Sequence, residues 1–249
     1  MTPTSTPSSN APDFTIGSDT HLFVLTGAGV SAESGVPTFR DAGGIWENHV
    51  AQDLATPEAF ARDPATVWRF YSDRRAKAAA VSPNAGHRAL ATLEASLGDR
   101  FLLATQNVDG LHAAAGSQRV VELHGNLFTT RCSVCDRPPF HDTAQYPDRP
   151  PHCERCGALA RPHIVWFGET LNALELARVT TFFRKGREAL LFLAVGTSGA
   201  VYPAAGLVDA ATGFGAQTWL VNADPADNGG RFQHFVQGKS AEVLPRLLG

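Results

Sequence analysis

The sequence predicts an α/β fold with a Rossmann-like, doubly wound parallel sheet, and two observations lead to this prediction. Four short apolar runs have the length of strands that are buried on both faces, and each run ends in small or polar residues. Stretches rich in Ala, Leu and Arg, which have a helical composition, lie between the runs. Strands that alternate with helices favour a parallel sheet, in which ligands bind beyond the carboxyl ends of the strands.

Each predicted element has a place along the chain. In order, strands or helices are expected at residues 22–25, 84–96, 101–103, 173–189, 190–195 and 219–221. The small or polar residues that follow the four strands begin at positions 27, 105, 196 and 222. We therefore expect these four loops to gather at one edge of the sheet.

Length, composition and charge limit the classes of function. The 249 residues suffice for one large domain or for a domain with an insertion, and they are 43% hydrophobic and 18% charged. The net charge of −3 argues against a protein that coats nucleic acid, and no apolar run approaches the ~20 residues of a membrane helix. We expect neither a nucleic-acid partner nor a membrane partner.

The first twenty residues are rich in Ser, Thr and Pro and contain no Lys or Arg. This composition matches neither a signal peptide nor a transit peptide. It predicts a flexible tail over residues 1–12, and the expected location of the protein is the cytoplasm.

All four cysteines lie between residues 132 and 156, as two C-x-x-C pairs separated by seventeen residues. This spacing is typical of zinc sites, and four thiolates complete a tetrahedral shell without a position for water. The segment between the pairs holds five prolines and few apolar residues, so it cannot build a core of its own. The pattern predicts one structural Zn²⁺, with a disulfide or redox role as the alternative. The ligands are Cys132, Cys135, Cys153 and Cys156, whereas His152 is interpreted as a surface residue.

A glycine-rich motif follows the first strand, because residues 27–32 match G-x-G-x-x-[GA]. Its glycines would let backbone N–H groups approach a pyrophosphate, although a tight strand-to-helix turn explains them equally well. A dehydrogenase would also place an acidic residue ~20 positions on, at the end of the next strand. Glu47 stands at that distance, but the surrounding DAGGIWENHV is not strand-like. A hydride-transferring Rossmann enzyme therefore fits poorly.

Seven segments of the chain, in this order, resemble those of the sirtuins, the NAD-dependent protein-lysine deacylases. They are GAGVSAESGVPTFR (27–40), TQNVDGLH (105–112), ELHGNLF (122–128), the two C-x-x-C pairs, RPHIVWFGE (161–169), GTSGAVYPAA (196–205) and VNAD (221–224). The family has a large Rossmann-like domain and a smaller domain made of a helical insertion and a zinc-binding insertion. The resemblance implies a Rossmann-like domain over 13–36, 81–127 and 166–249, a helical insertion over 37–80 and a zinc-binding insertion over 128–165.

The resemblance also implies that NAD is consumed as a co-substrate. In sirtuins the carbonyl oxygen of an acyl-lysine attacks the nicotinamide ribose, and nicotinamide leaves. A histidine then acts as general base on a ribose hydroxyl, and free lysine and O-acyl-ADP-ribose are released. The implied substrates are acyl-lysine proteins or peptides. The oligomeric state stays open, and a monomer is plausible.

The implied catalytic residues are His124, Asn107 and Asp109. An imidazole with the ordinary pKa of ~6.5 is mostly neutral near pH 7, which suits a general base. By residue type alone, His87 and His112 compete equally, and we interpret His87 as a helix-start residue and His112 as a packing or capping group. Asn107 and Asp109 match positions that hold the nicotinamide end and its ribose, although both residues also favour polar turns.

Further positions match the NAD contacts of the family. The implied contacts besides Asn107 and Asp109 are Gly27, Ala28, Gly29, Ser31, Ala32, Glu33, Thr38, Phe39, Arg40, Trp46, Gln106, Gly196, Thr197, Ser198, Asn222, Ala223, Asp224 and Ser240. Arg40 would face the phosphates and the leaving group, and Ser240 would lie near the adenine.

The substrate peptide lies in sirtuins as an added strand between two edges, which leaves its sequence loosely specified. One edge is matched by Val165 and by Phe167, Gly168 and Glu169, and the other by residues 199–201, which include Val201. A buried strand end would also explain the residues around Phe167.

One departure from many sirtuins concerns the acyl group. The chain has PTFR where many members have PDFR, and with Tyr71 and Arg74 it resembles the desuccinylase-type branch, class III. Tyr71 and Arg74 are three positions apart, so their side chains would share one face of a helix. The Arg74 guanidinium could bind the distal carboxylate of an acyl group, and the Tyr71 phenol could donate one more hydrogen bond to it. The small side chain of Ala55 would leave room for a succinyl or malonyl group. Arg75, which follows Arg74, would point ~100° away from Arg74 around the helix. The alternative is an ordinary surface helix.

Two other functions stay open. ADP-ribosyl transfer from NAD to a protein would use the same pocket, and no residue rules it out. The zinc segment could instead be a non-catalytic ribbon for nucleic acid or protein, although its arginines also suit a small exposed lobe. These arginines are Arg131, Arg137, Arg155 and Arg161. Salt-dependent DNA binding would distinguish this function.

Overall fold

The computed structural model describes residues 14–37, 45–46 and 49–249 of the chain. The expected tail over residues 1–12 lies outside the described residues, as do the implied NAD contacts Thr38, Phe39 and Arg40 and the side chain of Trp46.

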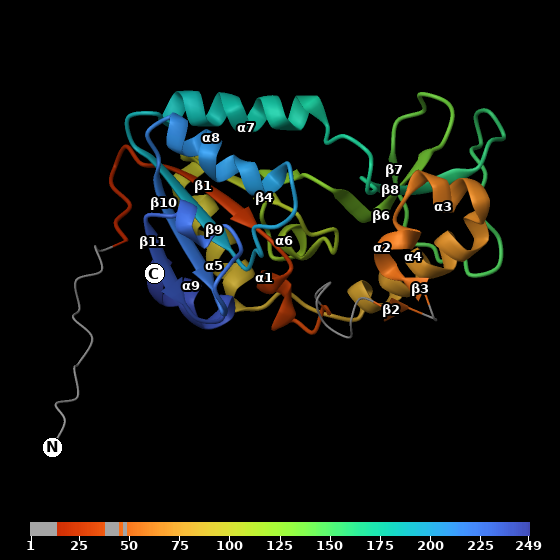
Figure 1. Ribbon diagram of the computed structural model, residues 1–249, viewed down its shortest axis with the longest axis horizontal. Coiled ribbons are helices and arrows are strands. Elements are labelled where there is room, and N and C mark those ends of the chain that lie inside the picture. The colour runs from red at the N-terminus through yellow and green to blue at the C-terminus, as the bar shows by residue number, and fades with distance from the viewer. Residues whose placement is uncertain (1–13, 38–44, 47–48) are drawn as a thin grey trace, which may run out of the picture.

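A six-stranded parallel sheet forms the centre of the larger part of the described chain (Figure 1). Its strands are β1 (His21–Thr26), β4 (Phe101–Thr105), β5 (Val120–Glu122), β9 (Leu190–Val195), β10 (Gln217–Asn222) and β11 (His234–Gln237), in the spatial order β11-β10-β9-β1-β4-β5. The chain runs outward from β1 to β5 and then restarts at β9 on the opposite side of β1. The switch point of this doubly wound sheet therefore lies between β1 and β9.

Helices cover both faces of the sheet (Figure 1). The helices are α7 (Ala173–Gly186) and α8 (Leu207–Gly213) on one face, and α5 (Ala85–Leu97) and α9 (Ser240–Leu248) on the other. This arrangement confirms the predicted Rossmann-like sheet, and each of the four expected strands is present.

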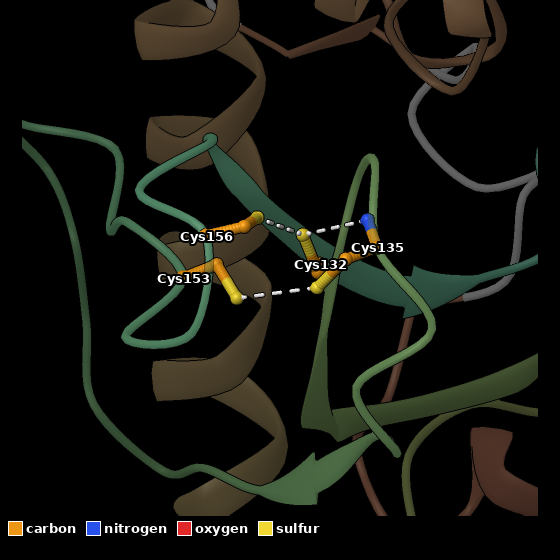
Figure 2. Close-up of side chains that lie close together, drawn as sticks. All are labelled: Cys132, Cys135, Cys153 and Cys156. Carbon is orange, nitrogen blue, oxygen red and sulfur yellow. Dashed lines mark hydrogen bonds between the residues drawn. The ribbon is translucent and has the colours of Figure 1, made fainter.

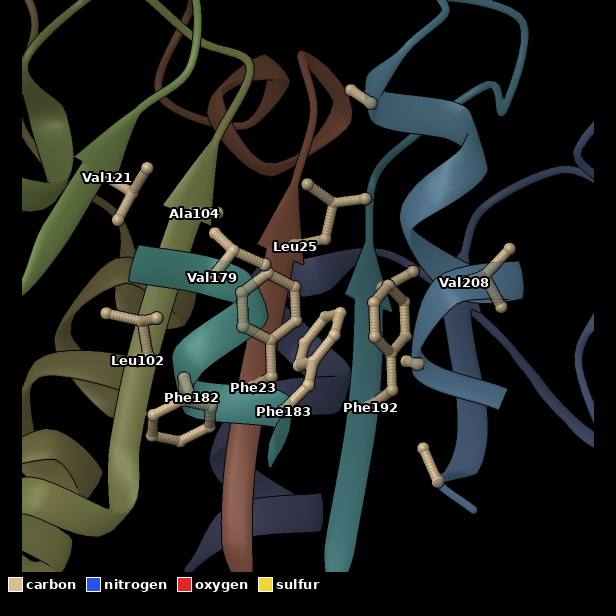
Figure 3. Close-up of a cluster of buried hydrophobic side chains, with 14 of the residues drawn as sticks. Phe23, Leu25, Leu102, Ala104, Val121, Val179, Phe182, Phe183, Phe192 and Val208 are labelled. Carbon is tan, nitrogen blue, oxygen red and sulfur yellow. The ribbon is translucent and has the colours of Figure 1, made fainter. Parts of the chain in front are cut away.

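Alternation of side chains along β1 explains why its sequence is apolar throughout. Phe23 and Leu25 belong to the core beneath α7 and α8, whereas Leu22 and Val24 belong to the core on the other face. Phe23 contacts Phe183 of α7 edge to face, with ring centroids 4.8 Å apart (Figure 3). A strand that is covered on both faces needs apolar residues at every position.

Three helices occupy most of residues 51–79, in the part of the chain where a dehydrogenase would have its second strand. They are α2 (Ala51–Leu54), α3 (Pro57–Arg62) and α4 (Pro64–Ala79). Thr56 and Asp63 are the N-caps of α3 and α4, and their side chains accept hydrogen bonds from the N–H groups of Ala59 and Thr66 at 3.1 and 3.0 Å. Each cap is followed by proline, which is favoured in the first turn of a helix.

The cysteine segment belongs to a small antiparallel sheet. In this sheet β6 (Gly125–Cys132) lies between β7 (Phe140–His141) and β8 (Ala160–Ile164). Shorter elements elsewhere are α1 (Gly29–Ala32), α6 (Leu111–Ala114), the pair β2 (Ile45–Trp46) and β3 (His49–Val50), and 3-10 turns at Gly98–Arg100, Ala204–Gly206 and Gly229–Arg231. None of the helices in the described ranges is both long and apolar enough to cross a membrane.

The helical segment and the small sheet share a core that is separate from the two cores of the large sheet. Buried Phe60, Trp68 and Tyr71 from α3 and α4 lie in one cluster with Leu127 of β6 and Trp166 beyond β8. We propose on this basis that the two segments form one smaller domain, with the boundaries that the sequence suggests.

Arg75 joins the two segments of this smaller part. Its side chain is 1% exposed, and its Nη1 lies 3.2 Å from Oδ2 of Asp142. Its other hydrogen bonds reach the carbonyl oxygens of Leu127, Thr129 and Ala144 and the hydroxyl of Thr130. Arg75 therefore supports the fold, and as the residue after Arg74 it lies about 100° away from Arg74 around the helix axis.

Candidate active site

The loops after β1 and β9 are in close backbone contact at the switch point of the sheet. A Cβ atom on Gly27 would lie 2.7 Å from the carbonyl oxygen of Gly196, and one on Gly29 would lie 2.7 Å from its Cα. Gly196 itself has a φ of +61°, which favours glycine. These glycines are therefore needed for the packing of one loop against the other.

The glycine loop differs in one respect from the expected pyrophosphate cradle. The N–H groups of Gly27, Gly29 and Ser31 donate to the carbonyl oxygens of Val195, Gly196 and Ala28. These three N–H groups are thus used within the fold, because the loops after β1 and β9 form backbone hydrogen bonds with each other. Side chains, and not these N–H groups, supply the polar surface.

Gln106 and Asn107 extend the same edge from the end of β4. The Gln106 amide donates to the Thr197 hydroxyl at 3.1 Å, which links the loops after β4 and β9. The Asn107 amide nitrogen donates to the carbonyl oxygen of Gly27 and to the Ser31 hydroxyl, at 3.1 Å each. Because the nitrogen of Asn107 is held in this way, its amide oxygen is oriented as the group that can accept from a ligand.

His124 has a defined tautomer. Its Nδ1 lies 2.9 Å from the carbonyl oxygen of Gln106, which can only accept, so Nδ1 carries the hydrogen. The second ring nitrogen, Nε2, is left with a lone pair. Burial lowers the pKa of His124 and outweighs the raising effect of the Gln106 carbonyl. The imidazole is therefore neutral near pH 7 and can take up a proton at Nε2.

The other two candidate histidines are buried behind the loops. His87 takes part in the capping box with Asn84 at the start of α5, as expected for a helix-start residue. His112 is 2% exposed and lies 2.9 Å from the Thr26 hydroxyl through Nε2, and the two imidazole rings are 4.8 Å apart. Both imidazoles are thus hydrogen-bonded within the fold, in agreement with the structural roles interpreted from the sequence.

Asp109 lies 6% exposed at the start of α6. Its Oδ1 accepts a hydrogen bond from the N–H of Leu111 at 2.9 Å, which leaves the other carboxylate oxygen for further partners. Burial lowers the pKa of His87 and that of Arg74, and the charge of Asp109 opposes the change in both, so the carboxylate is near enough to act on both groups. The residue thus lies between the edge of the sheet and the smaller part of the molecule.

Residues at the ends of β9 and β10 form the far side of this edge. Thr197 is buried, and its carbonyl oxygen accepts from the Asn222 amide at 3.2 Å. The same amide donates to the carbonyl oxygen of Asp224 at 2.7 Å. Ser198 accepts from the N–H of Ala200, and the carbonyl oxygen of Ala223 accepts from the Gln237 amide. Hydroxyl, amide and carboxylate groups thus line the region that the sequence assigns to the adenine ribose and the phosphates.

Glu33 and Ser240 contact each other directly. The Ser240 hydroxyl donates to the Glu33 carboxylate at 3.1 Å, and the same oxygen accepts from the N–H of Ala241 at 2.8 Å. A carboxylate at the start of α9 is favourable because helix N-termini carry unpaired N–H groups. This pair therefore fastens α9 to the first loop, a role that the sequence does not reveal.

The four cysteines meet at one point, with their Sγ atoms all within 4.8 Å of one another (Figure 2). The Sγ atoms of Cys132 and Cys156 are 3.5 Å apart, and those of Cys135 and Cys153 are 3.7 Å apart. A disulfide requires about 2.05 Å, whereas tetrahedral zinc with Zn–S bonds of about 2.3 Å places sulfurs about 3.8 Å apart. The cluster fits Zn²⁺ and does not fit disulfides.

The arginines of the zinc segment are paired with carboxylates. The pairs are Arg131–Glu169, Arg161–Glu169, Arg137–Glu154 and Arg155–Asp136. Arg131 and Arg161 share Glu169, so these four guanidinium groups face three carboxylates. Such pairing suits a small exposed lobe, and nucleic-acid binding by this segment stays an alternative that salt-dependent DNA binding would test.

Comparison with known proteins agrees with this arrangement. Residues 27–203 match the profile of the Sir2 family. The chain belongs to the Sir2 family. It is 47% identical over 239 residues to NAD-dependent protein deacylase 2 of Pyrobaculum aerophilum, an alignment that covers 94% of this chain and 92% of that protein. It is 44% identical to the NAD-dependent protein deacylase of Salmonella typhimurium, over 91% of this chain and 82% of that protein.

Solved structures of this family share the fold. A complex of a Sir2 homologue with NAD superposes with a TM-score of 0.83 at 39% identity, and the match covers 91% of this chain and 87% of the other. A Sir2 protein with a deacetylated p53 peptide and 3'-O-acetyl ADP-ribose superposes with a TM-score of 0.77 at 29% identity, over 91% of each chain.

The predicted peptide edges of this Sir2 protein are both exposed. Phe167 is 47% exposed and Val201 is 40% exposed, so both apolar side chains are accessible to a ligand. Val165 donates through its N–H to the carbonyl oxygen of His124, and Phe167 donates to that of Ala55, at 2.9 Å each. The segment therefore connects His124 with Ala55, a residue of the predicted acyl pocket.

Glu169, a third residue predicted at this edge, directs its side chain into the protein. Its carboxylate accepts hydrogen bonds from both Nη atoms of Arg161, at 2.7 and 2.9 Å, and from the N–H of Trp166 at 2.8 Å. The carboxylate therefore holds neighbouring residues in place. Gly168, with a φ of +87°, forms the turn between Phe167 and Glu169.

Tyr71 and Arg74 lie on α4, with Ala55 nearby in the same cluster. Tyr71 is 3% exposed, and burial raises its pKa to about 12. Burial also lowers the pKa of Arg74, while Tyr71 and Asp109 oppose this change. The phenol and the Asp109 carboxylate are therefore both near enough to the guanidinium for their charges to act on it. The sequence pattern did not reveal a further neighbour, Trp166, whose indole Nε1 lies 2.9 Å from the phenol oxygen.

Proposed function

We propose that this Sir2 protein is an NAD-dependent protein-lysine deacylase and that succinyl- or malonyl-lysine is its preferred substrate. The geometry of His124 carries the first part of the proposal. A neutral imidazole with its Nδ1–H on a carbonyl oxygen presents Nε2 as a general base at the edge of a parallel sheet. Names of relatives such as NAD-dependent protein deacylase support the same reaction class.

The residues at the sheet edge fit NAD by their chemistry. Two ribose diols need amide and carboxylate partners, which Asn107, Asp109 and Asn222 can supply. Phosphates need hydroxyl and amide donors, and Thr197 and Ser198 lie at the switch point. When bound, NAD supplies the ADP-ribose group that accepts the acyl chain, with nicotinamide as leaving group.

The chain's own groups have distinct tasks in this reaction. His124 takes up a proton at Nε2 from a ribose hydroxyl, and the Gln106 carbonyl keeps the ring in the correct tautomer. Asn107 is held by Gly27 and Ser31 so that its amide oxygen faces the ligand side. Phe167 and Val201 cover the acyl-lysine and exclude water from it. The zinc site holds β6 in place and takes no part in the chemistry.

Arg74 and Tyr71 support the preference for acidic acyl groups. A guanidinium and a protonated phenol on one helix face form a donor pair that matches a carboxylate. The buried location strengthens such hydrogen bonds, because water competes less well there. An acetyl group carries no carboxylate and gains nothing from this pair.

One assay on the purified protein tests both parts. Acetyl-lysine and succinyl-lysine versions of one peptide are incubated with and without NAD and followed by mass spectrometry. We expect NAD-dependent loss of succinyl, formation of O-succinyl-ADP-ribose and slower loss of acetyl. Loss of neither group would contradict the deacylase proposal, and NAD-dependent labelling of protein would then indicate ADP-ribosyl transfer.

Substitution of Arg74 isolates the acidic preference. Arg74→Met should lower kcat/KM for the succinyl peptide about 10- to 100-fold, the loss expected for a hydrogen bond to a charged group, and leave the acetyl peptide unchanged. Lys77→Met removes a positive charge from an exposed position of the same helix and serves as the control. An unchanged succinyl preference in Arg74→Met would rule out this role.

A further inference from the structure

The hydrogen bond between Trp166 and Tyr71 determines the direction in which the phenol hydroxyl can donate. Both residues are buried, at 2% and 3% exposure, and the indole Nε1 lies 2.9 Å from the phenol oxygen. An indole N–H can only donate, so the phenol oxygen must accept in this pair. The phenol hydrogen therefore has to point away from Trp166.

The second polar neighbour of the phenol is also a donor. Arg74 lies close enough for its charge to lower the pKa of Tyr71, and a guanidinium has no acceptor. Burial nevertheless raises the pKa of Tyr71 to about 12, so the phenol keeps its hydrogen at neutral pH. Because Trp166 and Arg74 can only donate, the phenol hydrogen needs an acceptor other than these two residues, and the carboxylate of an acidic acyl group has the required chemistry.

Trp166 is held in place from two directions. The Arg161 guanidinium carbon lies 3.3 Å from the ring centroid of Trp166, and Arg161 also donates to the Ile164 carbonyl oxygen at 2.9 Å. Glu169 binds both Nη atoms of Arg161 and accepts from the backbone N–H of Trp166. A guanidinium stacked on the ring and a carboxylate at the backbone leave the indole little freedom to turn.

We infer that Trp166, held by Arg161 and Glu169, is a positioning residue that orients the Tyr71 hydroxyl to donate into the acyl pocket and so determines the preference for carboxylate-bearing acyl groups. This inference rests on the proposed acidic-acyl activity. It assigns to the VWFGE segment a task beyond the peptide edge. It also explains why a charged side chain, Glu169, is directed inward at an otherwise exposed turn.

The substitution Trp166→Phe tests the inference with little change in shape. Phenylalanine keeps an aromatic ring beneath Arg161 and removes the N–H donor. The phenol is then free to rotate, and KM for a succinyl-lysine peptide should rise about threefold to tenfold, with kcat and the acetyl reaction nearly unchanged. Melting temperature and zinc content, measured on the same samples, check that the fold is kept.

A double-substitution cycle with Tyr71→Phe separates positioning from general damage. If Trp166 acts through the phenol, Trp166→Phe should have no further effect on the succinyl-to-acetyl ratio in the Tyr71→Phe background. An equal loss of both acyl activities, or the same loss of ratio with and without the phenol, would overturn the inference.

The parent protein, measured in the same experiment, distinguishes a failure of this inference from a failure of the proposed function. If it prefers the succinyl peptide and Trp166→Phe keeps the full preference, the positioning role is wrong and the proposed function stands. If it shows no preference for succinyl, both the acidic-acyl proposal and the inference that rests on it are wrong.

Discussion

The edge of the parallel sheet and the smaller part of the molecule are held in place by different kinds of interaction. At the sheet edge, glycine backbones touch, and neutral side chains such as Gln106 and Asn107 bind carbonyl and hydroxyl groups. The smaller part relies on buried or half-buried ion pairs, Arg75–Asp142 and Arg161–Glu169, and on four thiols. The large sheet has two apolar cores, whereas the smaller part has one core and needs these additional links.

The difference suggests a division of tasks. The groups proposed to react with NAD and the acyl-lysine lie on loops between buried strands, where backbone packing fixes their position. The groups proposed to select the acyl chain lie on α4 and in the segment after β8, where charge pairing fixes them. Changes at the sheet edge should therefore affect all substrates, and changes in the smaller part should affect some substrates or the stability.

The largest effect is expected for His124→Ala, because it removes the proposed general base from the sheet edge. Loss of a general base lowers kcat by about 10²- to 10⁴-fold, and we expect this loss for succinyl and acetyl peptides alike. His141→Ala, at an exposed position of β7, is the matched control. An effect on one acyl group alone would place His124 with the selecting residues and contradict the proposed division.

Arg75→Met tests whether the smaller part depends on its buried ion pair. The substitution leaves the Asp142 carboxylate buried without its cation, which costs about 3–5 kcal/mol of unfolding free energy. Urea unfolding measures this loss. The double variant Arg75→Met/Asp142→Leu should recover part of the stability, because both charges are then absent. Equal stability of the single and double variants would show that the charge pair is not the cause.

The smallest effect concerns the two buried histidines behind the sheet edge. Burial lowers the pKa of His87 to about 4 and that of His112 to about 3, whereas an unfolded imidazole has a pKa of ~6.5. As the pH falls below about 6.5, the unfolded chain binds protons that the folded chain excludes, so the stability decreases. We expect a loss of about 2 kcal/mol for each of the two histidines between pH 7.5 and pH 5.0, measured by urea unfolding.

A variant at His112 identifies the source of that loss. His112→Gln keeps a polar side chain near Thr26 and removes one titrating group. Its stability should decrease less than that of the parent protein over the same pH range. Parallel pH profiles for the two proteins would mean that His112 does not cause the pH dependence.

The sequence predicts those features that depend on local pattern. The apolar runs predicted the strands, and the C-x-x-C spacing predicted the cysteine cluster. Both signals lie in residues that are close together in the sequence. The meeting of the polar loops followed from the parallel sheet, in which all carboxyl ends share one edge. Motif resemblance then selected His124 from three histidines that are equivalent by residue type.

Pairings between distant segments were not predictable in this way. Glu33 binds at the start of α9, more than 200 positions away, and Trp166 reaches Tyr71 across 95 positions. No local pattern specifies such partners, since topology brings them together only after folding. The glycines after β1 are a milder case, because their motif was visible but their close contact with Gly196 depends on the position of β9.

The segment from Val165 to Phe167 has a consequence for the evolution of acyl selectivity. One end is hydrogen-bonded to the backbone of His124 and the other to that of Ala55, so the segment sets the distance between the proposed general base and the proposed acyl pocket. An inserted residue would lengthen this connection by at most about 3.3–3.6 Å and would displace Trp166. An insertion in this segment would therefore change both the distance from His124 to Ala55 and the position of Trp166. Substitutions on α4 change only the far end of the pocket, and they are the route by which a relative of this protein could acquire a different acyl preference.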